Sequence, residues 1–110
     1  MELSIIMPCL NEAETLEICI NKALLFLNNN NIAGEVIIAD NGSTDGSQKI
    51  AINNGAKLVH VEQTGYGAAL IAGINASNAQ FIIMGDSDDS YDFKNLNPFL
   101  DKLREGYELV

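Results

Sequence analysis

Four aspartates lie in one short segment that directly follows an apolar run. The run is Phe81–Met84, and the acids are Asp86, Asp88, Asp89 and Asp92. Successive side chains of an extended chain point to opposite faces, so Asp86 and Asp88 can point toward one place. Mg²⁺ and Mn²⁺ prefer such oxygen ligands, and Mg²⁺ is commonly held by one or two carboxylates together with substrate phosphates. The spacing predicts a metal site for a diphosphate ligand, with a solvated acidic turn as the plainer alternative.

A second segment with polar chemistry follows the first apolar run of the chain. Pro8 has a fixed φ and can hold the next residues at a set angle against a flat ligand, while Asn11 and Glu12 offer hydrogen bonds to a base or ribose. On this segment alone, the end of a strand followed by the N-terminus of a helix explains the same residues equally well.

Two further segments carry aspartate and glycine at the expected ends of strands. Ser43 or Thr44 is a suitable helix cap, and Asp45 suits the first turn of that helix. Capping does not require Asp40, so a contact from its carboxylate to a base or ribose is predicted. The glycines of 65–67 could admit a phosphate to a helix N-terminus, but a glycine turn that packs closely is as good an explanation.

The apolar spacing predicts strands that alternate with helices. The strands are expected at 3–7, 36–39, 57–61 and 81–84, and the helices at 14–27, 44–54, 68–77 and 95–105. Gly55 is expected to end the second helix as its C′ residue. Strands that are apolar on both faces indicate an α/β fold, a Rossmann-like parallel sheet with helices on both faces. Ligands bind beyond the carboxyl ends of such strands, where the four segments above would meet.

Composition limits the class of protein. The 110 residues are 47% hydrophobic and predict one globular domain over 1–110, without an apolar window long enough for a membrane span. The chain also lacks a secretory start, so the expected location is the cytoplasm, with Cys9 and Cys19 reduced. A net charge of −9 argues against nucleic acid as a partner. An anionic nucleotide could still bind if a divalent ion neutralised its phosphates.

Other functions can be tested against the acidic segment. An EF-hand that begins at Asp86 would place Tyr91 where glycine is needed and Asn97 where glutamate is needed, so this alternative fails. An aspartate-based phosphatase, a phosphate-accepting receiver domain and a non-catalytic nucleotide-binding or regulatory module remain open. His60, the single histidine, is expected to be an ordinary strand residue without a catalytic role.

Four motifs occur in a fixed order along the whole chain. They are Pro8-x-Leu10-Asn11-Glu12, Asp40-Asn41-Gly42-Ser43-x-Asp45, Gly65-Tyr66-Gly67-Ala68-Ala69 and Gly85-Asp86-Ser87-Asp88-Asp89. With them the chain resembles the GT-A glycosyltransferases of family 2, nearest the dolichyl- and polyprenyl-phosphate sugar synthases.

The resemblance implies an inverting transferase with a UDP- or GDP-sugar donor and an acceptor such as a polyprenyl phosphate. It implies Mg²⁺ or Mn²⁺ on Asp86 and Asp88, which form the Asp-x-Asp pair. The substrate-binding residues that it implies are Pro8, Leu10, Asn11, Glu12, Asp40, Asn41, Gly67, Asp86 and Ser87.

The chain departs from the family pattern at two positions. Asn41 stands where many members have a second aspartate, and Tyr66 where many have a basic residue. Members also continue beyond this length with the acceptor site and the general base, so no residue here is assigned as catalytic.

We therefore expect the donor-binding half of an enzyme, truncated at its C-terminal end and inactive alone. The longer protein would act in the cytoplasm or at the cytoplasmic face of the membrane. The strand at 81–84 is expected to form an exposed edge through which dimers assemble.

Overall fold

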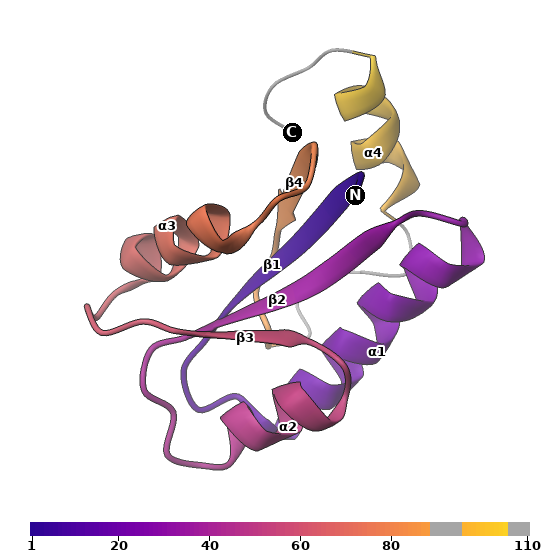
Figure 1. The fold of residues 1–110 in the computed structure, drawn as a ribbon. Coiled ribbons are helices and arrows are strands. Elements are labelled where there is room, and N and C mark those ends of the chain that lie inside the picture. The colour runs from indigo at the N-terminus through magenta and orange to yellow at the C-terminus, as the bar shows by residue number, and fades with distance from the viewer. Residues whose placement is uncertain (89–95, 106–110) are drawn as a thin grey trace.

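The computed structural model describes residues 1–88 and 96–105. In these ranges strands and helices alternate, as predicted (Figure 1). The elements are β1 (Leu3–Cys9), α1 (Ala13–Asn29), β2 (Gly34–Asp40), α2 (Ser47–Asn53), β3 (Lys57–His60), α3 (Tyr66–Ala76), β4 (Phe81–Met84) and α4 (Asn97–Arg104). The sequence of residues 107–110 also predicts the start of a further strand, but these residues lie outside the described ones.

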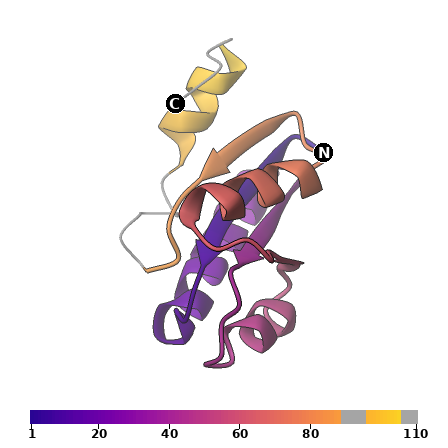
Figure 2. The ribbon, with the colours of Figure 1, turned by 90° about the vertical axis from the view of Figure 1, so that its left-hand side faces the viewer.

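The four described strands form one parallel sheet in the order β3-β2-β1-β4. The chain moves outward from β1 through β2 to β3 and then returns to the other side of β1. Connections between parallel strands of one sheet are right-handed. A connection that crosses the sheet in the reverse direction must therefore place its helix on the opposite face. Accordingly, α3 packs on one face of the sheet, and α1 and α2 lie on the other (Figures 1 and 2).

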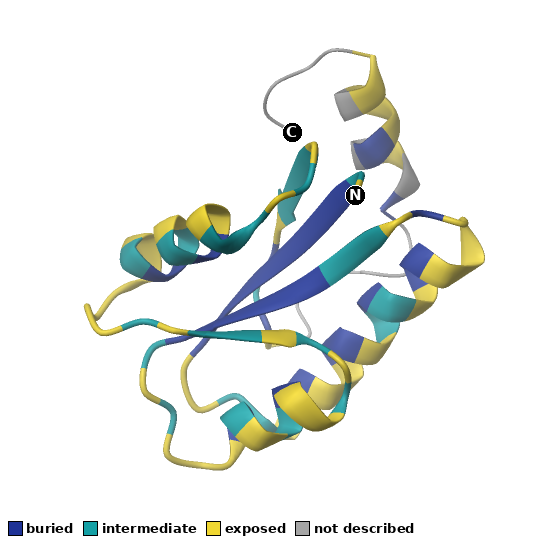
Figure 3. Ribbon diagram, viewed as in Figure 1, coloured by how far each residue is buried: buried dark blue, intermediate teal, exposed yellow. Residues whose placement is uncertain are grey.

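The main core lies between the sheet and α1. Alternate side chains of β1, from Leu3 to Cys9, point to this side and pack with the buried stripe of α1 and with β2. Leu100 of α4 is in the same cluster, so α4 covers the sheet on the α1 side. Burial is greatest along the two central strands: in Figure 3, β1 is dark blue throughout, and β2 is dark blue except at its start.

On the opposite face, α3 lies very close to β1. A Cβ added at Gly73 would be 2.6 Å from Ile6 Cγ2, so a side chain larger than hydrogen has no room there. Ala69 and Gly73 are the buried residues of α3. Two small residues one helical turn apart therefore determine how closely this helix approaches the sheet.

The prediction that Pro8 ends the first strand is wrong, because β1 continues to Cys9. β4 pairs with β1 only as far as Met84, which lies opposite Ile6. The backbone nitrogen of Pro8 is on the side of β1 that faces β4, but Pro8 lies beyond the last residue that pairs with β4. The N–H that proline lacks would therefore have made no hydrogen bond in the sheet.

The second helix begins later than predicted, and neither Ser43 nor Thr44 caps it. α2 begins at Ser47 after Gly46, which has a φ of 94° and provides no side-chain cap. The loop before it is occupied by other hydrogen bonds, described below. Gly55 is confirmed as the C′ residue: its φ is 86°, and the N–H groups of Gly55 and Ala56 bond to the carbonyls of Ile52 and Ala51.

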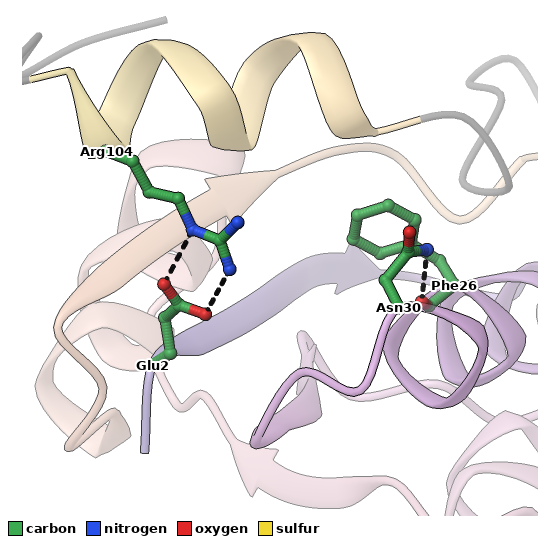
Figure 4. Close-up of polar contacts among 4 residues, drawn as sticks. All are labelled: Glu2, Phe26, Asn30 and Arg104. Atoms are coloured by element: carbon green, nitrogen blue, oxygen red, sulfur yellow. Dashed lines mark hydrogen bonds and ion pairs between the residues drawn. The ribbon is translucent and has the colours of Figure 1, made fainter.

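Two contacts at the amino edge of the sheet fix the ends of helices (Figure 4). Arg104 of α4 donates from Nε and a terminal nitrogen to the Glu2 carboxylate, at 2.8 and 2.7 Å. Asn30 Nδ2 donates to the Phe26 carbonyl at the end of α1. Both cysteines are buried, and neither is part of a disulfide.

Candidate functional site

A cavity of about 330 Å³ opens at the carboxyl edge of the sheet. It lies where the chain leaves β1 and β4, between which the order of the strands reverses. Ligands of open α/β sheets bind at this kind of switch point. The lining residues are Pro8, Cys9, Leu10, Glu12, Asn41, Gly65, Tyr66, Asp86, Ser87 and Asp88.

Most of the predicted site residues come together in this cavity. The predicted residues that line it are Pro8, Leu10, Glu12, Asn41, Asp86, Ser87 and Asp88. Asn11, Asp40 and Gly67 are not in the lining. Gly67 is exposed in the first turn of α3, where an added Cβ would meet nothing within 4 Å.

The segment that carries Asp86 and Asp88 is anchored through Ser87. This residue is only 2% exposed. Its Oγ donates to the Pro8 carbonyl at 2.9 Å, and its own carbonyl accepts from Thr15 Oγ1 at 2.6 Å. Asp86 and Asp88 flank this inward-pointing residue and both line the cavity. The hydrogen bonds of Ser87 thus hold the Asp-x-Asp segment to the end of β1 and to α1.

The donors in the lining fit a divalent cation that also binds phosphate. Glu12, Asp86 and Asp88 bring carboxylates to the cavity, and the described lining contains no Lys, Arg or His. Among residues 1–88 and 96–105, no group of three or more His, Cys, Asp or Glu side chains could hold a metal alone. Mg²⁺ is usually bound by one or two carboxylates, with phosphate oxygens and water at its other coordination positions, and Asp86 and Asp88 fit this pattern. Asp89 and Asp92 lie outside the described residues.

Asp40 is buried and is not part of the cavity lining; its carboxylate holds the loop after β2. Its Oδ2 accepts from the backbone N–H groups of Gly42 and Ser43 and from Gln48 Nε2, and its Oδ1 accepts from Ser43 Oγ. Burial raises the pKa of Asp40, but hydrogen bonds from Ser43, Gln48 and the Gly42 amide outweigh it and lower the pKa overall. Local structure therefore gives Asp40 a role that the sequence did not reveal, and its contact with a nucleoside stays a prediction.

Asn11 joins the loops that follow β1 and β2. Its backbone N–H donates to Ser43 Oγ at 2.9 Å, and its Oδ1 accepts from the Thr44 N–H at 2.8 Å. Asp45 adds a parallel connection, because its Oδ2 accepts from the Ala13 N–H at the start of α1. Asp45 Oδ1 accepts from the Ser47 N–H and hydroxyl. Ser43, Thr44 and Asp45 are structural residues, as predicted, although not as caps of the expected kind.

Three lining residues were not in the predicted set: Cys9, Gly65 and Tyr66. Cys9 is the last residue of β1, and its burial raises the pKa of the thiol. Gly65 and Tyr66 belong to the glycine segment that was expected either to admit a phosphate to a helix N-terminus or to form a closely packed turn, but neither was assigned as a site residue. The position of this segment after a predicted strand was the signal that it would reach the carboxyl edge of the sheet, and the structure places both residues in the cavity lining.

No helix in the described ranges is long and apolar enough to cross a bilayer.

Sequence comparison places the chain among known transferases. The profile of "Glycosyl transferase family 2" matches residues 4–110. The low-salt glycan biosynthesis hexosyltransferase Agl6 of Haloferax volcanii is 38% identical over 104 residues, covering 94% of this chain and 25% of that protein. The dolichyl-phosphate hexose transferase of the same organism is 37% identical over 76 residues, covering 69% of this chain and 33% of that protein. The chain thus spans a quarter to a third of these relatives.

Solved structures show the same fold. Glucosyl-3-phosphoglycerate synthase from Mycobacterium tuberculosis, in complex with Mn²⁺, UDP and glucosyl-3-phosphoglycerate, matches with a TM-score of 0.67 at 31% identity, covering 78% of this chain and 33% of that one. Mannosyl-3-phosphoglycerate synthase from Rubrobacter xylanophilus matches with a TM-score of 0.78 at 19% identity. The match covers 92% of this chain and 36% of that one. The architecture is that of the GT-A glycosyltransferases, as predicted. The chain belongs to glycosyl transferase family 2.

Proposed function

We propose that the cavity binds the diphosphate and nucleoside of a UDP- or GDP-sugar, with Mg²⁺ or Mn²⁺ held by Asp86 and Asp88. One observation carries the proposal: both carboxylates line a cavity at the switch point of the sheet, and the described lining holds no basic side chain. A diphosphate placed there needs a cation that the side chains of the described lining do not supply. A related synthase has been crystallised with Mn²⁺ and UDP, which supports the same assignment.

The lining residues divide by chemistry. Pro8 and Leu10 offer apolar surface to a base, Glu12 offers a polar group to base or ribose, and Ser87 holds the metal-binding segment. A bound divalent ion would supply positive charge to the departing diphosphate. Direct ligand contacts from Asn11, Asp40 and Gly67 remain predictions.

For the longer protein we propose an inverting transfer of sugar to an acceptor such as a polyprenyl phosphate, in the cytoplasm or at the cytoplasmic face of the membrane. The dolichyl-phosphate hexose transferase among the relatives supports this acceptor class. These 110 residues are proposed to bind the donor without completing the transfer. Sugar transfer to a polyprenyl phosphate by the purified chain would contradict this last point.

The experiment is a calorimetric titration of UDP and GDP into the chain, first with Mn²⁺ and then with EDTA. We expect one nucleotide to bind with Mn²⁺ and EDTA to abolish the binding. The double variant Asp86→Asn, Asp88→Asn should weaken Mn²⁺-dependent binding by at least about tenfold, because neutral amides attract the ion less than carboxylates do.

Asp101→Asn is the matched control, since this exposed residue lies on α4, which packs on the α1 side of the core. It removes one negative charge without touching the cavity and should leave binding unchanged. A nucleotide affinity that is the same with and without Mn²⁺, and the same in the double variant, would overturn the metal assignment. A non-catalytic nucleotide-binding module would give that result.

A further inference from the structure

The connection between β3 and α3 leads into one wall of the cavity, because Gly65 at its end and Tyr66 at the start of α3 are both lining residues. Its first residue is attached to the sheet: the Val61 N–H donates to the Asp40 carbonyl at 2.9 Å. The next three residues, 62–64, are exposed. An exposed connection keeps a fixed place only if a contact holds it there.

Asn41 makes such a contact. Its Nδ2 donates to the Gln63 carbonyl at 2.8 Å, across 22 positions in the sequence. Asn41 is itself fixed to the end of β1, because its backbone N–H donates to the Cys9 carbonyl at 2.9 Å. This geometry requires a side-chain donor, which an amide has and an ionised carboxylate lacks.

We propose that Asn41 is a positioning residue of the donor site, whose side-chain amide holds the 61–65 connection so that Gly65 and Tyr66 form the cavity wall. The ligand then meets a wall that is already in place, which lowers the ordering cost of binding. The inference rests on the proposed function for its ligand, but the contact itself can be tested without one. Because Asn41 also lines the cavity, direct contact with the ligand is the rival explanation.

The first test is hydrogen–deuterium exchange in the ligand-free chain. Asn41→Ala removes the donor, and Asn41→Asp replaces it with a carboxylate that repels the Gln63 carbonyl. Both should speed exchange of the amides of 62–67 by about fivefold, the equivalent of one net hydrogen bond. Amides of β1 and β2 should keep their native rates, which shows that the variants are folded.

The matched control is Asn78→Asp, which makes the same charge change at an exposed residue just before β4, at the opposite edge of the sheet. It should leave exchange of 62–67 unchanged. Direct contact with a ligand cannot alter exchange in its absence, so native rates in both Asn41 variants would overturn the proposal.

The second test is a double-mutant cycle on Mn²⁺-dependent nucleotide affinity. Asn41→Ala should weaken binding by about fivefold in the native background and have little further effect in a Tyr66→Ala background, because its effect passes through the wall. An equal loss in both backgrounds would mean that Asn41 acts on the ligand directly, which overturns the positioning role. If the native chain binds neither UDP nor GDP, the proposed function and the affinity effect both fail, while exchange still decides whether Asn41 holds the wall.

Discussion

At the residue scale, polar side chains at the carboxyl edge are used to hold loops as well as to line the cavity. Asp40 accepts hydrogen bonds from Gly42, Ser43 and Gln48, and Ser87 reaches the Pro8 carbonyl. Both side chains are nearly inaccessible to solvent, at 1% and 2% exposure. Such contacts let exposed loops carry a defined site, because each buried donor and acceptor restricts the loop to one arrangement.

Replacing Asp40 tests this role. Asp40→Asn should lower the free energy of unfolding by about 2 kcal/mol at neutral pH, because the variant loses charge-assisted hydrogen bonds and directs an amide N–H₂ toward donors. Urea denaturation measures the change. Asp101→Asn, an exposed substitution of the same chemistry, should stay within about 0.5 kcal/mol of native.

The same pair predicts a dependence on pH. The pKa of Asp40 is lower in the folded chain than its ordinary value, so its contribution is present above that ordinary value and lost as pH falls through the folded pKa. The stability difference between native chain and Asp40→Asn should therefore shrink below about pH 4. A difference that stays constant to the acid limit would show that the carboxylate is not the stabilising species.

At the element scale, the close approach of α3 to β1 determines where the first turn of this helix meets the cavity. Gly73 lies against Ile6, and Tyr66 stands two helical turns before it at the cavity wall. α3 is apolar on most sides, with Ile71 61% and Ile74 40% exposed. Its position therefore depends on the small residues that face the sheet, and not on a clear amphipathic stripe.

Gly73→Ala should destabilise the chain by about 1 kcal/mol, because overpacking against Ile6 exceeds the gain in helix propensity. Gly67→Ala in the same helix has open space around its new methyl group and should be neutral or stabilising by up to about 1 kcal/mol. Thermal or urea unfolding compares the two variants. Equal stability of both would show that α3 can move away from β1 without cost.

At the scale of the whole molecule, the described sheet has β4 at one edge, paired with β1 alone. Met84 at the end of this strand is 37% exposed. Unpaired apolar edges favour pairing with another strand. We propose that isolated chains associate through β4.

Sedimentation velocity across the micromolar range should show dimers of the isolated chain, and Met84→Lys should shift the chain toward the monomer because a charged edge resists pairing. Asn78→Lys places the same charge on an exposed loop and should leave association unchanged. A native chain that stays monomeric throughout would contradict edge pairing.

The order of the elements and the segments that form the site could be predicted from the amino-acid sequence alone. Apolar runs and helical spacing are local patterns, so the strands from β1 to β4 and the glycine end of α2 could be predicted within a few residues. Because parallel strands bring their carboxyl ends to one edge, the same patterns indicated that the segments after all four strands, β1 to β4, would meet.

Which residues of those segments line the cavity and which hold the loops depends on contacts between elements. Asp40 turns inward because Gln48 and the Ser43 amide lie behind it, while Asn41 reaches Gln63 because β2 and β3 are neighbours. The reversal of strand order beside β1, which creates the cavity, depends on crossovers that span the domain. Such contacts join residues far apart in the chain, and no local pattern encodes them.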